Sequence, residues 1–556
     1  MINKKISFII LFVIIVLAAV IRLWQLGVVP PSPDWDEASL GYNAYSIMTT
    51  GKDEYGKFLP FILRSFDDYK PALYAYFIIP FIKFFGLNIL AVRLPAALFG
   101  ILTVLATYLL VKELLNSKYG EHIALLSSFF LAISPWHIQF SRVAFEAQVG
   151  LAFNIFAILF FLKGLKKHLM LLPSVLFAGL SIYIYQSEKV YLPILFAALF
   201  IIYRKDILSL PKKWLAGVFI LGAIIVLPMF YQLVTNQNVL LRAKGVSVYS
   251  DQTQFLKRNA EKYNADKQAK NYLGILVDNR RIEYVKAVVS GYISHWDLNW
   301  LFITGDIERH HAPFMGLLYL FELPFLFIGI YQLLFGDFSK KGKLTIFAIF
   351  LIAPIPASIT SGVPHAVRTI NFLPTFQIFV SLGILTTAMF VSRIKYKVLS
   401  IKVSYFIFSF GILFFIFNFL YFLNQYFVQQ NYYFSQNWQY GYKQAIDFIK
   451  PVMKNYDSIV VSNQSPLDQS YIFFLFYLKY NTVEYQKLGG TGTGGFRENH
   501  KGFSNITFRP IVWDNEKVDD KTLFIGRPGD FNSNTNILKK INYLNGNNAI
   551  TIGVKE

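Results

Sequence analysis

The stretch ISFIILFVIIVLAAVIRL, residues 6–23, followed closely by the acidic loop PDWDEA, residues 33–38, decides the class of fold. The first stretch is almost entirely apolar. Its length is close to the roughly 20 residues that an α-helix needs to cross the hydrocarbon core of a bilayer. The charged residues before it and the lack of a small-residue cleavage site predict an uncleaved signal anchor with a cytoplasmic N-terminus. We therefore expect the chain to enter a membrane at once and to present carboxylates on its outer side.

Composition extends this expectation to the whole chain. Of the 556 residues, 54% are hydrophobic and only 15% are charged, whereas soluble proteins carry about 25% charged residues. Cysteine is absent, which excludes disulfides, a thiolate nucleophile and cysteine metal sites. The formal net charge is +20, but many basic residues lie in short loops between apolar runs, where the positive-inside rule places them. The composition predicts a multi-pass membrane protein that has no nucleic-acid partner.

Apolar runs recur up to residue 425, and short basic loops between them mark the cytoplasmic side. Four spans between 72 and 162 would put the basic turn at Lys163 on the wrong side, so one segment there is expected not to cross. Ser134-Pro135-Trp136-His137 is a candidate for a break in that region. We predict about eleven transmembrane helices, with outer loops at about 24–71 and 234–313. After the first, the runs lie at about 72–86, 94–111, 122–140, 142–162, 170–186, 190–203, 214–233, 314–335, 344–360, 371–390 and 403–425.

The tail after residue 425 has a different pattern. A helix-like stretch at 441–450 is followed by strand-like runs at 458–462 and 522–526. Between the two runs lies a glycine-rich segment, which lacks the sequence context of a nucleotide-binding loop and is interpreted as a flexible turn. We predict a transmembrane domain over residues 1–425 and a small α/β domain outside the membrane over residues 426–556.

Two carboxylates of the acidic loop are the first candidates for chemistry. Asp36 or Glu37, pointing into a cavity at the membrane face, can act as a general base toward an acceptor hydroxyl or amine, while the other orients it or holds a cation. The competing interpretation is that Asp34, Asp36 and Glu37 simply open a helix, because acidic residues favour the first helical turn. The residues alone leave both interpretations open.

A second cluster, Asp67-Asp68-Tyr69-Lys70-Pro71, stands just before the next apolar run. Lys70 lies at the outer end of a span, where the positive-inside rule gives it no orienting role. A cation there can bind a lipid phosphate and stabilise the charge that develops as a sugar–phosphate bond breaks. In the alternative, Asp68 caps a helix with Pro71 in its first turn, and Lys70 only extends to the membrane interface. The nearby acids favour the phosphate role.

The short outer turn Pro364-His365-Ala366-Val367-Arg368 carries a third set of candidates. Arg368 is expected to bind phosphate through its planar guanidinium. His365 is a weaker candidate for a supporting metal ligand or proton relay, because a lone histidine is more often structural. His295 and the pair His310-His311 are weaker still, since no HExxH or comparable ligand spacing is present.

Three stretches together resemble a known family. They are Asp36-Glu37-Ala38 with Gly41-Tyr42-Asn43-Ala44-Tyr45, then Asp68-Tyr69-Lys70-Pro71-Ala72-Leu73-Tyr74, then Ala91-Val92-Arg93-Leu94-Pro95-Ala96-Ala97-Leu98-Phe99-Gly100. They resemble the bacterial branch of the protein O-mannosyltransferase and aminoarabinose transferase family, whose members are GT-C fold glycosyltransferases of family 39. The resemblance covers roughly residues 5–425 and is strongest in the first hundred.

The resemblance implies an inverting transfer of a sugar from a polyprenyl-phosphate donor to a lipid, glycan or protein acceptor on the outer face of the membrane. In such enzymes the Asp-Glu pair supplies the catalytic carboxylate, which falls on Asp36 with Glu37 beside it. The lysine of a Lys-Pro-Pro-Leu segment contacts the lipid phosphate, and that position is Lys70. Some relatives carry an acid near a bound divalent metal where this chain has Tyr69. Asp68 is then the candidate for a supporting or metal-binding role, and no cofactor is assigned.

Two rival functions belong to other classes. A transporter or flippase for lipid-linked sugars would place charged residues and broken helices near the bilayer midplane, often in repeated halves. Here the notable acids lie in an outer loop, and no repeat is apparent in the sequence. An inactive relative that acts as a scaffold would tolerate the loss of Asp36 and Lys70. We therefore expect a glycosyltransferase of the cell envelope, in the plasma membrane of a bacterium.

Overall fold

The computed structural model describes residues 3–66, 68–236, 245, 247–248, 255–394, 401–489, 500–533 and 535–555. Its internal contacts divide the chain into two compact units. Unit 1 comprises Met1–Ala18, Gly100–Ile138 and Ala147–Phe419, and unit 2 comprises Ala19–Phe99, Gln139–Glu146 and Leu420–Glu556. The chain passes between the two units several times. The expected domain boundary at 425/426 stays a prediction.

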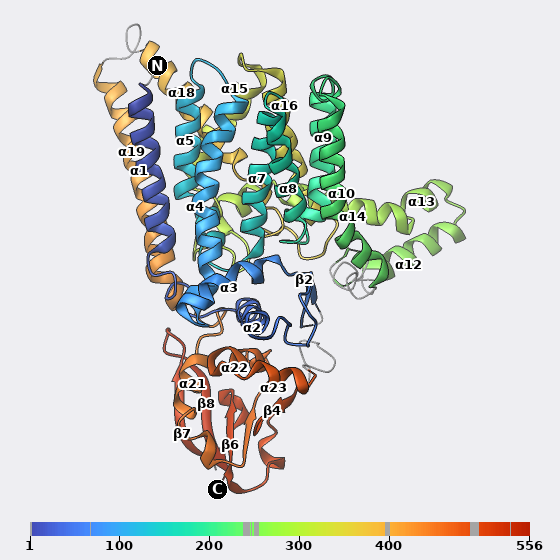
Figure 1. The fold of residues 1–556 in the computed structure, drawn as a ribbon, viewed down its shortest axis with the longest axis vertical. Helices are drawn as coiled ribbons and strands as arrows, with labels where there is room; N and C mark the ends of the chain where they lie inside the picture. Colours follow the sequence, from blue (N-terminus) through green and yellow to red (C-terminus); the bar gives the residue numbers. More distant parts are fainter. Residues whose placement is uncertain are drawn as a thin grey trace. The chain divides into compact units, whose positions relative to one another are not determined.

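Unit 1 is a bundle of apolar helices (Figure 1). Two of them, α15 and α18, approach closely because glycines face the neighbouring backbone. A Cβ on Gly329 of α15 would lie 1.7 Å from the carbonyl oxygen of Phe379, and one on Gly383 of α18 would lie 2.0 Å from that of Phe325. The bundle contains α5 (Gly120–Ile133), α7 (Glu146–Gly164), α8 (Leu171–Ser181), α9 (Glu188–Leu208), α10 (Lys212–Thr235), α15 (Glu322–Phe335), α16 (Lys340–Ile352) and α18 (Thr375–Ile394), with most of α1 (Lys4–Leu23), α4 (Ile89–Leu114) and α19 (Ile401–Asn424).

The expected multi-pass membrane character is confirmed. Among the described residues, seven helices are long and apolar enough to cross a membrane, or eight if the bent pair of α5 and α6 (Pro135–Ser141) is one span. That pair bends by 58° at Ser134, where the sequence indicated a break. The next candidate for a segment that does not cross is α3 (Leu73–Phe85), which has 13 residues and is therefore only about 20 Å long. The seven spans are Lys4–Leu23, Ile89–Leu114, Glu146–Gly164, Lys212–Thr235, Lys340–Ser358, Ile370–Ser392 and Ser409–Phe434.

The loop at about residues 24–71, which the sequence predicts on the outer side, folds into a helix and a hairpin within unit 2. The helix α2 spans Trp35–Thr50, and the antiparallel strands β1 (Ile62–Ser65) and β2 (Asp68–Pro71) follow it. The alternative in which Asp68 caps a helix is wrong, because Asp68 is the first residue of β2 and the N-cap of α3 is Ala72. Residues 68–71 form strand β2, which pairs with β1. This pairing places Lys70 opposite Leu63.

The C-terminal part of unit 2 contains the sheet that the sequence predicted (Figure 1). Its six strands have the order β4-β5-β3-β6-β8-β7; β3 pairs in parallel with β5 and β6, and the outer pairs are antiparallel. The expected glycine-rich turn lies almost entirely outside the described residues. The elements are α21 (Tyr442–Ile449), β3 (Ser458–Val461), α22 (Ser470–Leu478), α23 (Thr482–Lys487), β4 (His500–Phe503), β5 (Ile506–Phe508), β6 (Asp519–Gly526), β7 (Thr535–Asn542) and β8 (Asn548–Lys555).

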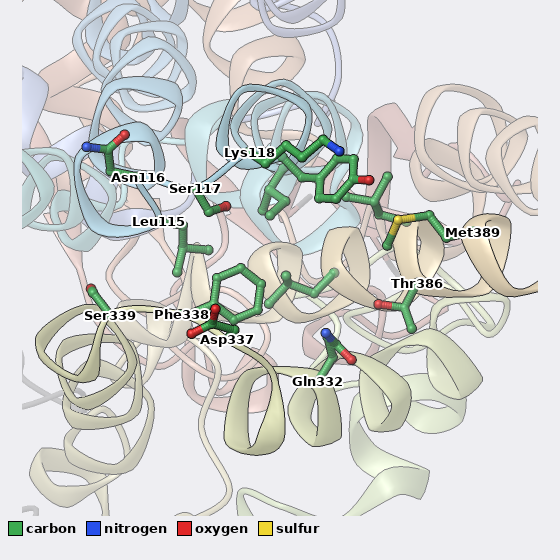
Figure 2. Close-up of a pocket in the computed structure, with 14 residues that line it drawn as sticks. Leu115, Asn116, Ser117, Lys118, Gln332, Asp337, Phe338, Ser339, Thr386 and Met389 are labelled. Atoms are coloured by element: carbon green, nitrogen blue, oxygen red, sulfur yellow. The ribbon is translucent and has the colours of Figure 1, made fainter. Parts of the chain in front are cut away.

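Unit 1 has a cavity of about 580 Å³ between the α4–α5 connection, the end of α15 and α18 (Figure 2). Its polar lining includes Ser117, Lys118 and Asp337. These residues lie beside the basic turn at Lys340, which the sequence assigns to the cytoplasmic side. The cavity is therefore at the end of the bundle where no site residue was predicted.

Candidate active site

The acidic loop leads into α2 through a capped helix start. Asp34 is the N-cap, and its Oδ1 accepts a hydrogen bond from the Glu37 N–H at 2.8 Å. The Glu37 carboxylate accepts one in return from the Asp34 N–H at 3.3 Å, which completes a capping box. The prediction that these acids open a helix is confirmed. Because the cap fixes the first turn, Asp36 and Glu37 leave the helix in defined and different directions.

Glu37 is buried and paired with an arginine. Its side chain is 2% exposed, and the Arg93 side chain is fully buried. Arg93 donates from Nε and Nη2 to the two carboxylate oxygens, each at 2.8 Å, in a bidentate pair. The Ala144 N–H donates a further hydrogen bond at 2.9 Å. All these contacts hold the Glu37 carboxylate inside unit 2 rather than at its surface.

Arg93 also binds the chain that precedes the acidic loop. Its Nη1 donates to the carbonyl oxygens of Leu26 and Pro30, at 3.2 and 2.8 Å, and its Nη2 donates to that of Ser32 at 2.8 Å. The guanidinium lies 6.0 Å from the ring centroid of Trp438. One buried cation therefore fixes the course of the loop on the N-terminal side of α2.

Asp36 pairs with Lys70, whereas Glu37 pairs with Arg93. The Lys70 ammonium lies 2.5 Å from Asp36 Oδ1 and 4.0 Å from the carboxylate of Glu146. The Lys70 and Glu146 side chains are 6% and 11% exposed, whereas that of Asp36 is 39% exposed. The structure thus brings two of the predicted residues together and leaves one carboxylate of the group accessible. A lysine between two acids can exchange one of them for an incoming phosphate oxygen, and the accessible carboxylate can take a proton.

Sequence reasoning missed Arg93 and Arg142 as parts of this site. Arg142 donates to the carbonyl oxygens of Ile21, Arg22 and Val29 at 2.6, 2.9 and 3.1 Å. The available signal was an arginine within an otherwise apolar helical segment, as Arg93 stands in residues 89–100. A charge in such a place is rare and usually paired. Arg93 binds backbone carbonyls of the loop before α2, and Arg142 binds those of the last turn of α1 and of Val29; the spacing of residues does not reveal these contacts.

A polar network joins α2 to the hairpin that carries Lys70. The side chains of Ser39 and Ser65 are hydrogen-bonded at 3.0 Å, and Asn43 Nδ2 donates to Glu54 Oε1 at 2.8 Å. The Glu54 N–H donates to Asn43 Oδ1 at 3.1 Å. Burial raises the pKa of Glu54 to about 8, although the hydrogen bond from Asn43 opposes this shift. Glu54 is therefore protonated at neutral pH and supports the loop as a neutral group.

The other predicted residues belong to unit 1 or lack a described side chain. Arg368 Nη1 donates to Thr360 Oγ1 at 2.6 Å and to the Ser361 carbonyl oxygen at 2.8 Å, just before the predicted turn at 364–368. His365 lies in the same turn, with its ring centroid 5.1 Å from that of His310. The Asp68 side chain, the candidate for a metal-binding role near Lys70, lies outside the described residues.

Histidines gather around one aspartate near this turn. The Asp306 carboxylate accepts hydrogen bonds from the Ala366 N–H at 2.6 Å and pairs with His310 Nδ1 at 2.9 Å. Burial opposes ionisation of Asp306, but the interactions with His310 and His365 lower its pKa to about 2. Burial lowers the pKa of His310 as well. The sequence indicated only isolated histidines here and gave no reason to connect them with Asp306.

Comparisons with known proteins bear on both the family and the fold. Residues 69–231 match the family described as dolichyl-phosphate-mannose-protein mannosyltransferase. No curated protein matches the chain. The solved structure of ArnT from Cupriavidus metallidurans in the apo state is similar with a TM-score of 0.53 at 11% identity, over 99% of this chain and 98% of that one.

Two further solved structures are more distant. ArnT from the same organism bound to undecaprenyl phosphate has a TM-score of 0.49 at 12% identity, over 99% of this chain and 97% of that one. The archaeal oligosaccharyltransferase AglB from Archaeoglobus fulgidus, in complex with an inhibitory peptide and a dolichol-phosphate, has a TM-score of 0.49 at 13% identity. That match covers 85% of this chain, which spans only 64% of the archaeal enzyme.

The matched residues include Lys70 and Arg93, and the fold similarity to apo ArnT extends over nearly the whole chain. The resemblance seen in the sequence is thereby confirmed. The chain has a GT-C fold similar to that of apo ArnT, and its residues 69–231 match the protein mannosyltransferase family, so both comparisons support a membrane glycosyltransferase of this type.

Proposed function

We propose that the protein transfers a sugar from a polyprenyl-phosphate donor to a lipid, glycan or protein acceptor, with inversion at the anomeric carbon. The observation that carries this proposal is the group of Asp36, Lys70 and Glu146, in which a nearly buried ammonium lies 2.5 Å from an accessible carboxylate. The matching family is named for a dolichyl-phosphate-linked mannose, a donor of the same class. We place the reaction on the outer face, because the basic turns assign the acidic loop to that side.

In the proposed reaction, Lys70 exchanges the Asp36 carboxylate for an oxygen of the donor phosphate. The acceptor oxygen attacks the anomeric carbon, the bond from that carbon to the phosphate oxygen breaks, and its electron pair remains on the lipid phosphate. Asp36 takes the proton of the acceptor hydroxyl. Lys70 stabilises the charge that grows on the leaving phosphate. We retain Arg368 as a second proposed phosphate ligand on the evidence of the sequence alone.

Glu37 takes a different role in this proposal. The sequence made it a catalytic candidate beside Asp36, but its carboxylate is occupied by Arg93 and by two backbone N–H groups. A carboxylate in such surroundings is poorly placed to receive a proton from an acceptor. We propose that Glu37 positions the start of α2 and that Asp36 is the base.

The proposal is tested with purified protein in liposomes, labelled polyprenyl-phosphate sugars and candidate acceptors. We expect sugar transfer by the wild type and by Asp447→Asn, a control at an exposed salt bridge of α21, and transfer lower by about 100-fold or more by Asp36→Asn. Labelled lipid that crosses the bilayer without sugar transfer would assign a transporter instead. Equal transfer by Asp36→Asn and the wild type would remove Asp36 from the mechanism.

A further inference from the structure

Three potential metal-ligating side chains meet in unit 1, away from the acidic loop in the sequence. One ligand atom from each of Asp306, His310 and His365 lies within 4.8 Å of the other two. Asp306 and His310 lie in the segment after the helical turn Trp300–Thr304, and His365 lies in the outer turn before α18. The three side chains therefore join two segments that are distant in the sequence.

The residues around the cluster orient it. The Ala366 N–H donates to Asp306 Oδ2 at 2.6 Å, which ties the aspartate to the backbone beside His365. The His365 N–H donates to His295 Nε2 at 3.1 Å, and His295 Nδ1 lies 2.6 Å from the Gly291 carbonyl oxygen. Both ring nitrogens of His295 therefore interact with backbone groups, one with the His365 N–H and the other with the Gly291 carbonyl oxygen. Such supporting hydrogen bonds are typical around metal-binding side chains.

The donor set is suited to one class of ion. Two imidazoles and one carboxylate favour Zn²⁺ and similar transition metals, whereas Mg²⁺ and Ca²⁺ prefer oxygen ligands alone. In a tetrahedral site with bonds of about 2.0–2.2 Å, two ligand atoms of one ion lie roughly 3.3–3.6 Å apart. The three groups therefore need to close by up to about 1.5 Å around an ion. Their low exposure removes much of the competition from water: the Asp306 and His310 side chains are 7% and 6% exposed.

We propose that Asp306, His310 and His365 bind one divalent transition-metal ion of the Zn²⁺ type. The ion fastens the segment containing Asp306 to the outer turn containing His365. Three protein ligands leave a fourth coordination position for water or an anionic oxygen. The site is distinct in its residues from the possible metal position at Asp68, and it does not depend on the proposed sugar transfer.

The test measures Zn²⁺ binding by full-length purified protein after removal of bound metal, using equilibrium dialysis and elemental analysis. The variants are His310→Gln and His365→Gln, and the matched control is His168→Gln, a histidine of the same unit whose Nδ1 contacts only a backbone carbonyl among the described residues. We expect one tightly bound Zn²⁺ in the wild type and in the control. Loss of a supporting residue typically weakens a metal site 10- to 100-fold, so loss of a ligand should weaken it by at least about 100-fold.

Two further measurements keep the outcome decisive. Zn²⁺ should raise the thermal midpoint of the wild type and not that of the His310→Gln variant. If a histidine variant does not fold, Asp306→Asn, which keeps the side-chain volume, is measured in its place. No binding by the wild type at micromolar Zn²⁺, or equal binding by the wild type and all the ligand variants, would overturn the proposal. Displacement of Zn²⁺ by equimolar Mg²⁺ would overturn the assigned metal class.

Discussion

The buried pair of Glu37 and Arg93 allows the most quantitative prediction, which concerns Arg93→Lys. Arg93 makes five hydrogen bonds, two to the Glu37 carboxylate and three to the carbonyl oxygens of Leu26, Pro30 and Ser32. A lysine keeps the positive charge but has only three N–H donors. At least two of the five hydrogen bonds are therefore lost in the variant.

Each hydrogen bond lost from the buried guanidinium costs about 1–3 kcal/mol, so the expected loss of stability is roughly 2–6 kcal/mol. The matched control is Lys112→Ala near the other end of the same helix. Lys112 pairs with Glu121 at 2.7 Å, but its side chain is 53% exposed. Exposed ion pairs typically contribute no more than about 1 kcal/mol. Arg93→Lys keeps the charge but changes the buried hydrogen bonds, whereas Lys112→Ala removes the charge of an exposed ion pair. Comparing the two variants therefore separates the effect of buried hydrogen bonds from the effect of charge.

The assay is the half-life of folded, monodisperse protein in detergent at a fixed elevated temperature, because large membrane proteins often unfold irreversibly. A factor of ten corresponds to about 1.4 kcal/mol. If a stability loss of 2 kcal/mol acts entirely by speeding up unfolding, the half-life becomes roughly 30-fold shorter. A half-life of Arg93→Lys close to those of the wild type and the control would refute the assigned role of Arg93.

Three more predictions follow from the contacts of unit 2. Lys70→Gln should lower sugar transfer by roughly 100- to 1,000-fold in a labelled-donor assay, as expected for loss of one charge-stabilising group, and unchanged transfer would contradict the phosphate role. Gln486→Ala removes the hydrogen bonds from its side-chain amide to Ser46 Oγ, to Thr50 Oγ1 and to the Asp53 carbonyl oxygen; we expect faster hydrogen exchange at the end of α2, and unchanged exchange would oppose this. Glu54 has its pKa raised from 4.5 to about 8 by burial, so its contribution to stability is complete below about pH 4.5 and is lost as the pH rises toward 8. Glu54→Gln should therefore flatten the fall in thermal stability between pH 5 and pH 8, and parallel curves for both proteins would contradict the shift.

The parts of the fold that were predictable from the sequence depend on local patterns. Apolar length identified the membrane helices, and a proline after a serine located the break at Ser134. The acids before α2 predicted its start, because capping residues act within one helical turn. The strands β3 and β6 were likewise visible as short apolar runs between turns.

The partners of the charged residues were not predictable, because they are set by contacts between distant segments. Asp36 and Glu37 are adjacent in the sequence, but one pairs with Lys70 and the other with Arg93. The alternative in which Asp68 caps a helix is wrong because that residue pairs in a strand, and no local signal indicated the pairing of β1 with β2. The cluster of Asp306, His310 and His365 likewise forms only because the turn that contains His365 packs against a segment about 60 residues earlier in the chain.

The central claim is that Asp36 is the catalytic base and that Lys70 binds the lipid phosphate. The most direct test measures donor binding and sugar transfer in the same preparations of the wild type and Asp36→Asn, with a labelled polyprenyl-phosphate sugar. The account predicts that Asp36→Asn binds the donor at least as well as the wild type, because Lys70 no longer pairs with a carboxylate at 2.5 Å. It also predicts that transfer falls by about 100-fold or more, since a general base contributes roughly 10²- to 10⁴-fold. Transfer by Asp36→Asn at the wild-type rate would contradict the account.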